Sequence, residues 1–535
     1  MPNQTPNSPV PLDGLAGLKQ NFHQDATSGF VVFLLALPLS LGIAAASEFP
    51  PIMGVVTAII GGIVATFFSG SQLAIKGPAA GLIVIVADAV GAFGGGVEGW
   101  RLALGVMVVA GVIQILMGVL KWGKFVDIFP LSAVHGMLAA IGLIIIAKQA
   151  PVLLNVDPAL ASGKGPLALF ASIPEFIRNL DPNVALIGIT SLVIMFAWGL
   201  VKHPKLKQIP APLLVLLFAI PASLILDLKN TAPDYTLVVV GRLADQVGLN
   251  ASAEGISQTG TFVKFVIMVS LVGTLESLLT VKAIDGLDPW KRKADPNKDV
   301  IAIGVSNSLA GLLGGLPMIS EVARSSANVN QGGRTRWANF FHGLFLLLSA
   351  LLAYQLLELI PNAALAAMLI AVGFRLAHPK EFAHALKIGP EQLAIFVTTI
   401  VVTLARDLLV GIAAGMILKA VIHIGRGAPL TSLFRSGVRV STDGTQVTLR
   451  LGKAAVFTNY LGLKEELDRI PPGKTITLDL SQTVVIDHSV LDNLHHFGDE
   501  YARSGGQVAY HGLDKLTAVS AHPHSARKRH PKSQT

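Results

Sequence analysis

Glu276 and Thr280 are the residues of this sequence whose types and spacing most directly indicate chemistry. They lie four residues apart in the apolar run IMVSLVGTLESLLTVKAI, so both side chains point to one face of the expected helix. A charge near the centre of a membrane span costs about 2.5–3.5 kcal/mol on insertion scales, and such a carboxylate indicates a function. A carboxylate, a hydroxyl and main-chain carbonyls suit Na⁺, a hard cation that prefers oxygen. An ion pair of Glu276 with Lys282 or Arg324 is the structural alternative.

Two short stretches of small residues predict an anion site. The first is GPAAG at 77–81, and the second lies in GGLPMISEVARSSANVNQGGRTRWANFF at 314–341. A helix N-terminus exposes unpaired N–H groups and the positive end of the helix dipole, so two such ends facing each other form an anion cradle. GPAAG alone is more simply a helix break with close packing, but its pairing with the second stretch favours a cradle. The expected lining residues are Gly77, Ala79, Ala80 and Gly81 in the first stretch, and Ser320, Glu321, Val322 and Ala323 in the second.

Arg324 and Glu321 bring opposite charges to this cradle. The guanidinium would add fixed positive charge for an anion, whereas an unpaired carboxylate would repel it. The two residues are three apart, so on a helix they share a face and can pair with each other. Both roles of Arg324 are compatible, and Glu321 raises the possibility of proton coupling.

Composition defines the class of protein that must position these residues. The chain has 535 residues, of which 52% are hydrophobic and 14% charged, with a mean hydropathy of +0.61. Soluble proteins have about 25% charged residues, so this chain is typical of a polytopic α-helical membrane protein. There is no cysteine and no HExxH motif, which argues against a catalytic zinc site and against an enzyme. The net charge of +8 fits cytoplasmic loops rather than nucleic acid.

The apolar segments form two sets of seven. We predict fourteen segments in a transport domain over 26–425, preceded by a polar cytoplasmic tail at 1–25. The third segment of each set, 78–94 and 320–331, is short or broken by Gly and Pro. Such a matched pair predicts two half-helices in inverted repeats, with a binding site near the midplane. Lys and Arg are denser in the loops that lie inside when the N-terminus is cytoplasmic, which favours that orientation.

The chain changes character after about residue 430. Alternating segments such as VTLRLGKAAVFTNY and the helical pattern HSVLDNLHHFGDEYARSG predict a small α/β domain over 436–517. The basic remainder, 518–535, is expected to be a disordered tail.

These motifs, in this order, resemble the SulP family of inorganic anion transporters with a cytoplasmic STAS domain. The resemblance rests on GPAAG, GTLESLLTVKAID, GGLPMISEVARSSANVNQGGRTR and LDLSQTVVIDHSVL, and it covers about residues 20–515. ALPLSLGIAAAS at 36–47 is nearest to the sodium-dependent bicarbonate branch. In that branch an acidic residue and a threonine at the spacing of Glu276 and Thr280 hold Na⁺, and the arginine matching Arg324 belongs to the anion site.

The resemblance implies a secondary active transporter of the inner (plasma) membrane, with no cofactor other than Na⁺ as coupling ion. Bicarbonate uptake by an elevator-like motion is the leading expectation, with a homodimer as the assembly. Proton-coupled transport of sulfate or a dicarboxylate through Glu276 or Glu321 is the alternative, as is an anion channel. In the STAS-like segment, Ser489 aligns with a phosphorylatable serine of soluble relatives, but Asp487 and Ser489 are expected to cap a helix.

Overall fold

The computed structural model describes residues 9–123, 128–203, 206, 209–233 and 235–529. The chain packs into two compact units. The first comprises residues 1–123 and 141–376, and the second comprises 124–140 and 377–535. Within the described residues, eight helices are long and apolar enough to cross a membrane, and four shorter apolar helices accompany them. The expected polytopic helical class is therefore confirmed.

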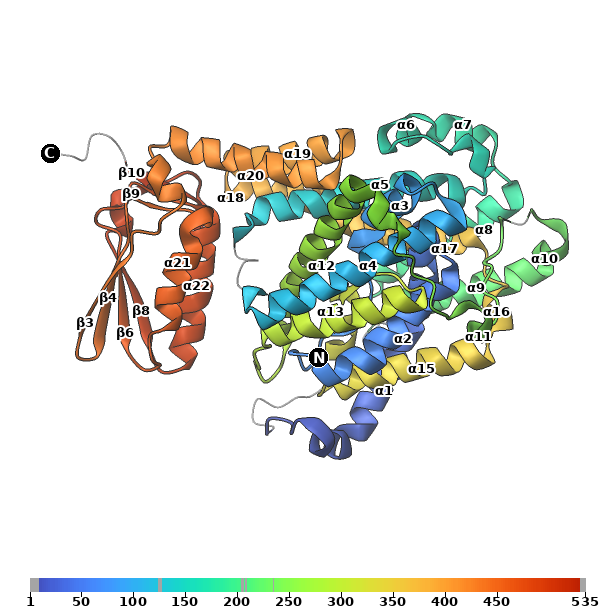
Figure 1. Ribbon diagram of the computed structural model, residues 1–535, viewed down its shortest axis with the longest axis horizontal. Helices are drawn as coiled ribbons and strands as arrows, with labels where there is room; N and C mark the ends of the chain where they lie inside the picture. Colours follow the sequence, from blue (N-terminus) through green and yellow to red (C-terminus); the bar gives the residue numbers. More distant parts are fainter. Residues whose placement is uncertain (1–8, 124–127, 204–205, 207–208, 234, 530–535) are drawn as a thin grey trace. The chain divides into compact units, whose positions relative to one another are not determined.

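The first unit contains most of the long helices (Figure 1). In chain order they are α1 (Gly14–Ala46), α2 (Pro51–Phe68), α3 (Ile83–Ala92), α4 (Gly96–Val119), α8 (Pro182–Leu200), α9 (Ala211–Ile225), α12 (Thr259–Leu287), α13 (Pro296–Leu313), α14 (Val322–Asn330), α15 (Trp337–Leu352) and α17 (Asn362–Leu376). Helix α5 (Leu131–Leu153) begins in the second unit and ends in the first. Short helices lie in the connections: α6 (Pro166–Ala171), α7 (Ile173–Arg178), α10 (Leu228–Thr231), α11 (Leu243–Gln246) and α16 (Tyr354–Leu357).

The predicted repeat is present in the order of the elements. Each half contains two long helices, then a three-residue strand with a short helix, and then four further helices. In the first half these elements are α1, α2, β1–α3, α4, α5, α8 and α9. In the second half they are α12, α13, β2–α14, α15, α17, α19 and α20. The strands β1 (Lys76–Pro78) and β2 (Met318–Ser320) stand at equivalent positions and pair antiparallel. Antiparallel pairing is what an inverted relation between the two halves requires. The two expected half-helices are thus the short helices that follow β1 and β2.

Small residues allow the helices around these strands to pack closely. A Cβ built on Gly62 of α2 would lie 2.4 Å from the Cα of Gly343 on α15, and one built on Gly111 of α4 would lie 2.7 Å from the Gly304 oxygen on α13. In a membrane, where apolar burial gives helices little reason to associate, such close backbone approach is a main source of packing. The tight packing of α2 with α15 and of α4 with α13 holds β1 and β2 in place.

The second unit combines three helices with a small α/β domain. The helices are α18 (Pro379–Ile388), α19 (Pro390–Ala405) and α20 (Leu408–Gly425). The domain has a sheet in the order β3 (Arg439–Asp443), β4 (Gln446–Arg450), β6 (Thr475–Asp479), β8 (Gln507–His511), in which only β3 runs antiparallel to its neighbour. Helices α21 (Tyr460–Asp468) and α22 (His488–Arg503) cover one face of this sheet (Figure 1).

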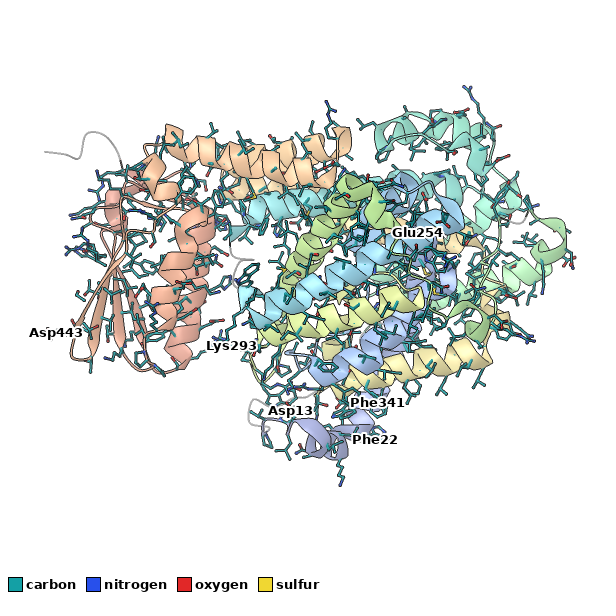
Figure 2. The ribbon with its side chains drawn as sticks, in the orientation of Figure 1. Asp13, Phe22, Glu254, Lys293, Phe341 and Asp443 are labelled. Atoms are coloured by element: carbon teal, nitrogen blue, oxygen red, sulfur yellow. The ribbon has the colours of Figure 1, made fainter. Side chains whose placement is uncertain are left out.

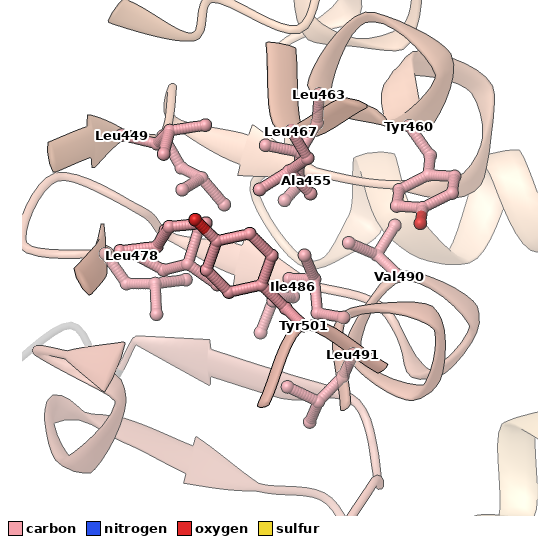
Figure 3. Close-up of a cluster of buried hydrophobic side chains, with 14 of the residues drawn as sticks. Leu449, Ala455, Tyr460, Leu463, Leu467, Leu478, Ile486, Val490, Leu491 and Tyr501 are labelled. Carbon is pink, nitrogen blue, oxygen red and sulfur yellow. The ribbon is translucent and has the colours of Figure 1, made fainter. Parts of the chain in front are cut away.

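The core of the C-terminal domain lies between that sheet and its two helices. Leu449 and Leu478 from the sheet meet Leu463, Val490 and Leu491 from the helices, and all are buried (Figure 3). Alternate residues of β4 and β6 supply this core, as the period of two in VTLRL and TITLDL predicts. A second, smaller sheet contains β5 (Ala454–Ala455), β7 (Val485–Ile486), β10 (Arg527–Arg529) and β9 (Leu516–Ala518).

Both chain ends differ from the sequence expectation where they are described. Residues 14–25, expected to be a polar tail, form the start of α1, because Asp13 caps the helix and the buried Asp25 accepts hydrogen bonds from the main chain of Arg334 and Thr335. The tail from 518 is ordered as far as Arg529, because β10 pairs with β7 and β9. Residues 530–535 lie outside the described part of the chain. The C-terminal domain also shares one compact unit with α18–α20 instead of separating from them after residue 430.

Candidate functional site

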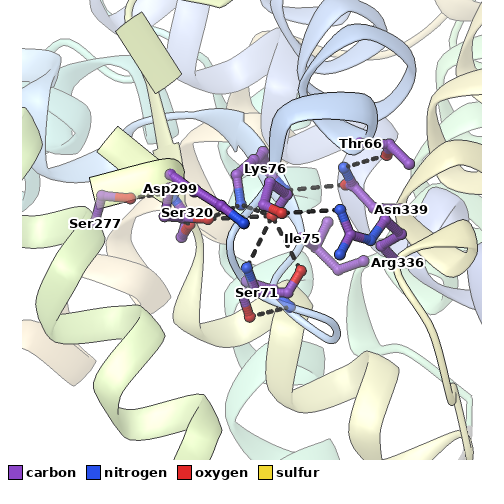
Figure 4. Close-up of polar contacts among 12 residues, drawn as sticks. Thr66, Ser71, Ile75, Lys76, Ser277, Asp299, Ser320, Arg336 and Asn339 are labelled. Atoms are coloured by element: carbon purple, nitrogen blue, oxygen red, sulfur yellow. Dashed lines mark hydrogen bonds and ion pairs between the residues drawn. The ribbon is translucent and has the colours of Figure 1, made fainter. Parts of the chain in front are cut away.

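The predicted half-helices meet where β1 and β2 pair (Figure 4). Lys76 is opposite Ser320, Gly77 opposite Ile319 and Pro78 opposite Met318. The Ala79 N–H donates to the Pro317 oxygen (3.2 Å). These strands are buried, and their main-chain groups are satisfied partly by each other and partly by side chains of neighbouring helices, which is how irregular backbone is tolerated inside a membrane protein. We call this pair of strands, with the first turns of the short helices, the crossing.

Each short helix begins immediately after its strand. A 3₁₀ turn over Ala80–Leu82 leads into α3, and α14 begins at Val322 with Glu321 as its N-cap residue. Val322 is 53% exposed, so the first turn of α14 is accessible. The predicted cradle residues are therefore brought together by the crossing, but two expected roles change. The Ala79 N–H is taken by Pro317, and the Ser320 hydroxyl donates to Asp299 (3.2 Å).

Arg324 is fully buried one turn into α14. Its Nη2 donates to the Ser40 hydroxyl on α1 (3.2 Å), and its Nε lies 3.7 Å from a carboxylate oxygen of Glu321. Among the described residues, Nε and Nη1 have no hydrogen-bond partner. Both sequence interpretations of Arg324 fit this geometry, since it pairs with Glu321 and keeps two nitrogen atoms available for a ligand.

The two carboxylates lie against the first half-helix. The Glu321 carboxylate lies near the Ala80 main chain, where an anion would be expected to bind. Glu276 reaches the same turn from α12, because a Cβ built on Gly81 would lie 1.8 Å from its Oε1. Its Oε2 is buried and has no hydrogen-bond partner in the described structure. Thr280 is also buried on α12, as the spacing predicts.

Glycine is required at both ends of the first cradle. A Cβ built on Gly77 would lie 2.2 Å from Nη1 of Arg324, just as one on Gly81 would collide with Glu276. The sequence predicted that these small residues let an anion reach the backbone. In the structure they also make room for the Arg324 guanidinium and the Glu276 carboxylate. Two carboxylates, Glu276 and Glu321, and the guanidinium of Arg324 thus lie at or against the crossing, and Arg375 of α17 acts electrostatically on Glu321 from beyond ion-pair distance.

Sequence reasoning missed a set of polar side chains that hold the crossing. Asn339 of α15 accepts from the Lys76 N–H (3.1 Å), and Ser277 of α12 accepts from the Ser320 N–H (2.9 Å) (Figure 4). Asn307 of α13 accepts from the Met318 N–H (2.7 Å). The signal was available, because a polar residue inside an apolar span is costly and marks a role. However, single Asn and Ser residues are common in apolar spans, so the sequence alone cannot show which of them bind the strands of the crossing.

A cavity of about 610 Å³ lies close to the crossing in the first unit. Its lining includes Lys293, Lys298 and Arg336, together with Ser69, whose hydroxyl lies 3.0 Å from Nζ of Lys76. Figure 2 shows Lys293 and Asp13 toward one end of the unit's helices, while Glu254 precedes the opposite end of α12. A basic cavity thus opens at the end of the unit where α12 finishes.

Curated relatives match almost the whole chain. A putative sulfate transporter of Bacillus subtilis, YvdB, is 25% identical over 508 residues, covering 92% of each chain. The bicarbonate transporter BicA of a Picosynechococcus species is 26% identical over 438 residues, covering 80% of this chain and 75% of that protein.

Solved structures share the fold. The transmembrane domain of a cyanobacterial bicarbonate transporter, BicA, superposes with a TM-score of 0.62 at 24% identity, covering 74% of this chain and 97% of that one. SLC26A9 superposes with a TM-score of 0.66 at 15% identity, covering 92% and 84%. Residues 22–399, which include every residue of the crossing, match the sulfate permease family. With more than half of its length in that match, the chain belongs to the sulfate permease (SulP) family of anion transporters.

Proposed function

We propose that the protein is a secondary active transporter that takes up an inorganic anion, bicarbonate in the first place, together with Na⁺. The observation that carries the proposal is the pair of carboxylates at the crossing: Glu321 pairs with Arg324, whereas the buried Glu276 has no ion pair in the described structure. Like charges repel strongly in a medium of low dielectric constant, so an anion enters this site only when a cation compensates one carboxylate. Coupling of anion to cation then follows from the residues themselves.

Na⁺ is the cation that the geometry favours. Glu276 offers a buried carboxylate oxygen without a hydrogen-bond partner in the described structure, and Thr280 lies one helical turn further on. Hard cations prefer such oxygen ligands. Filling this position with Na⁺ would neutralise Glu276 and leave Glu321 balanced by Arg324. The anion then binds beside Arg324 and the accessible first turn of α14.

The moving part is the group of elements that meet at the crossing. Helices α1 and α12 each contact both short helices, α3 and α14, and they also contact β1 and β2 respectively. Elevator-like movement of this group is the mechanism we propose from the resemblance. The basic cavity near Lys293 supports a cytoplasmic location for that end, with both termini inside. The C-terminal domain is proposed to be a STAS domain that regulates transport or supports a homodimer.

Proton-coupled sulfate or dicarboxylate transport is the second candidate. A proton on Glu276 or Glu321 would correct the charge balance as well as Na⁺ does. The putative sulfate transporter YvdB, similar over 92% of the chain, gives this alternative specific support.

Uptake into proteoliposomes tests the proposal. Labelled bicarbonate, sulfate and succinate are compared under an inward Na⁺ gradient, an inward proton gradient, or neither. We expect saturable bicarbonate uptake that rises with the Na⁺ gradient. Uptake that ignores Na⁺ over a wide concentration range but follows the proton gradient would transfer the assignment to the second candidate. Non-saturable flux without any coupling would indicate a channel.

A further inference from the structure

Lys76 and Asp299 form a fully buried ion pair that the proposed function does not use. Lys76 Nζ lies 2.8 Å from Oδ1 of Asp299, and both side chains have an exposed fraction of 0%. Lys76 directly precedes GPAAG, where a lysine could attract anions to the site opening or extend its ammonium group to the membrane surface. Its burial excludes the second role, and its pairing cancels the charge that the first role needs.

One carboxylate holds both strands of the crossing. Oδ1 of Asp299 accepts from Lys76 on β1, and Oδ2 accepts from the Ser320 hydroxyl on β2 (3.2 Å). Lys76 and Ser320 are also register partners across the two strands. Ser69 completes the cluster, with its hydroxyl 3.0 Å from Nζ and 3.1 Å from Oδ1 (Figure 4). Asp299 lies in the first turn of α13, so this helix anchors the two strands at the same point.

Stability alone is a poor explanation for the pair. Replacing a buried ion pair with apolar residues of similar volume is often neutral or stabilising, whereas removing one partner leaves an uncompensated buried charge. Here that charge would lie next to Gly77 and Ser320, two residues of the proposed anion cradle. The pair therefore controls both the position of the strands and the electrostatic potential in the cradle.

We propose that Lys76 and Asp299 form an electroneutral clamp, which positions both strands of the anion cradle and contributes no net charge to it. This inference rests on the proposed function and adds two positioning residues to the same site. It assigns the charge of the site to Glu276, Glu321 and Arg324, with Arg375 acting on Glu321.

If this clamp exists, removing the charge of Asp299 and removing the charge of Lys76 should change the anion affinity in opposite directions. Asp299→Asn keeps the size of the side chain but leaves the ammonium uncompensated, so the anion should bind more tightly. Lys76→Met leaves the carboxylate uncompensated, so the anion should bind more weakly. With an effective dielectric constant of about 20, a unit charge about 12 Å from the anion changes the affinity by about tenfold in each direction, and a closer charge changes it by more. The double variant restores neutrality, and its affinity should return to within about threefold of the parent.

The experiment measures two quantities on full-length protein at pH 7.5. One is the KM and maximal rate of uptake in proteoliposomes, and the other is the rise in melting temperature of purified protein with added bicarbonate or sulfate. The matched control is Glu175→Gln, which removes a carboxylate from the partly exposed Lys164–Glu175 pair of the same unit and should leave KM unchanged. Both single clamp variants should also lower the maximal rate, because the strands lose an anchor.

The outcomes separate the clamp from the function on which it rests. Absence of uptake and of thermal stabilisation by either anion in the parent protein would overturn the proposed function. A functional parent whose two single variants shift KM in the same direction, or not at all, would overturn the clamp. If a single variant does not fold, Lys76→Arg and Asp299→Glu replace it. These keep the charges and should lower the maximal rate without changing KM, and a tenfold change in KM would contradict the inference.

Discussion

The molecule contains two buried Lys–Asp pairs whose surroundings differ. In the first unit, Lys76 and Asp299 are fully enclosed at the crossing, 2.8 Å apart. In the second unit, Lys419 of α20 lies 3.2 Å from Oδ2 of Asp487, at the start of α22, and both are buried. The first pair links strands and a helix of the proposed transport site. The second links an apolar helix to the C-terminal domain.

The difference lies in what else each carboxylate holds. Asp487 accepts main-chain hydrogen bonds from Val490 and Phe457, both at 2.7 Å, so it remains well bonded if its lysine is lost. Asp299 holds mainly side chains: Lys76, Ser69 and Ser320. We infer that the pair in the first unit tunes a binding site, while the pair in the second unit joins two parts of one folded body. Each prediction below tests that division.

The largest effect is expected from Glu276→Gln, which keeps the size of the side chain and removes its charge. If Glu276 binds Na⁺, the variant loses Na⁺-stimulated uptake, and the Na⁺ concentration for half-maximal uptake rises more than tenfold. Thr280→Val removes one neutral oxygen and should raise that concentration only several-fold. Uptake rates measured against Na⁺ concentration in proteoliposomes check both. Unchanged Na⁺ dependence in Glu276→Gln would show that the cation site lies elsewhere.

Glu321→Gln is the companion variant at the same crossing. It removes the carboxylate that lies near the Ala80 main chain, so an anion should bind more tightly and the KM should fall. A variant that is misfolded or binds more weakly would instead show that pairing with Arg324 is the main role of this residue.

The next effect concerns the glycine beside Glu276. Gly81→Ala places a Cβ where Oε1 of Glu276 lies, so either the carboxylate or the half-helix must move, and we expect transport to fall at least tenfold. Gly91→Ala on α3 is the matched control, because a Cβ there meets no described atom within 4 Å. Uptake and melting temperature are measured for both. Equal activity of the two variants would mean that the described contact is not needed for transport.

These residues also show how far the sequence alone could lead. The matched Gly/Pro breaks predicted two short helices meeting at one site, because broken segments inside a membrane need each other to satisfy their backbone. Glu276 followed from the cost of burying charge, and Arg324 and the cradle glycines followed from their places in these matched breaks. Asp299 did not, since it stands near the start of α13, where an acidic residue is also expected to stabilise a helix N-terminus. Only the three-dimensional structure shows that its carboxylate points to Lys76.

The second unit shows the same limit. Asp487 was predicted to cap α22, and it does so by accepting from the Val490 N–H. Ser489 was predicted as a second cap, and this was wrong, because its hydroxyl accepts from Lys419 Nζ at 2.8 Å. A cap is a local feature that six residues reveal. The contact with Lys419 joins residues seventy positions apart, and no local pattern encodes it.

A smaller effect on transport but a clear effect on stability is expected from Lys419→Met. Removing one partner of a buried pair costs about 3–5 kcal/mol, and the main-chain bonds to Asp487 place this variant at the lower end. Burial raises the pKa of Asp487, but Lys419, His423 and the two main-chain donors outweigh burial and lower it. Its stabilising contribution is thus present above the unfolded pKa of about 4 and is lost as pH falls below it. Thermal unfolding should show a lower melting temperature, with KM for Na⁺ unchanged. A changed Na⁺ dependence would contradict the division between the two pairs.

The smallest effect is expected from histidines that hold the C-terminal strands. The ring of His495 on α22 stacks on that of His524 with centroids 4.3 Å apart, and His524 Nδ1 lies 2.8 Å from Asp492. His488 Nδ1 lies 2.6 Å from the His524 oxygen. These contacts hold the segment between β9 and β10 against α22. The charged or titratable groups that act on the cluster are His384, Lys419, Asp487, Asp492, Asp499 and Arg527.

Acidification should loosen this segment. Burial lowers the pKa of His488, His495 and His522, so the fold favours their neutral forms. The stability that they contribute is present above the unfolded pKa of about 6.5 and is lost as pH falls through that value toward the folded one. Amide exchange in β9 and β10, divided by the intrinsic rate at each pH, should be several-fold faster at pH 5.5 than at pH 7.5. His495→Phe keeps a stacked ring that cannot be protonated, so the pH dependence should shrink. If the amide protection of β9 and β10 is equal at both pH values, the prediction is wrong. The hydrogen bonds between β7, β9 and β10 would then hold the segment without the histidines.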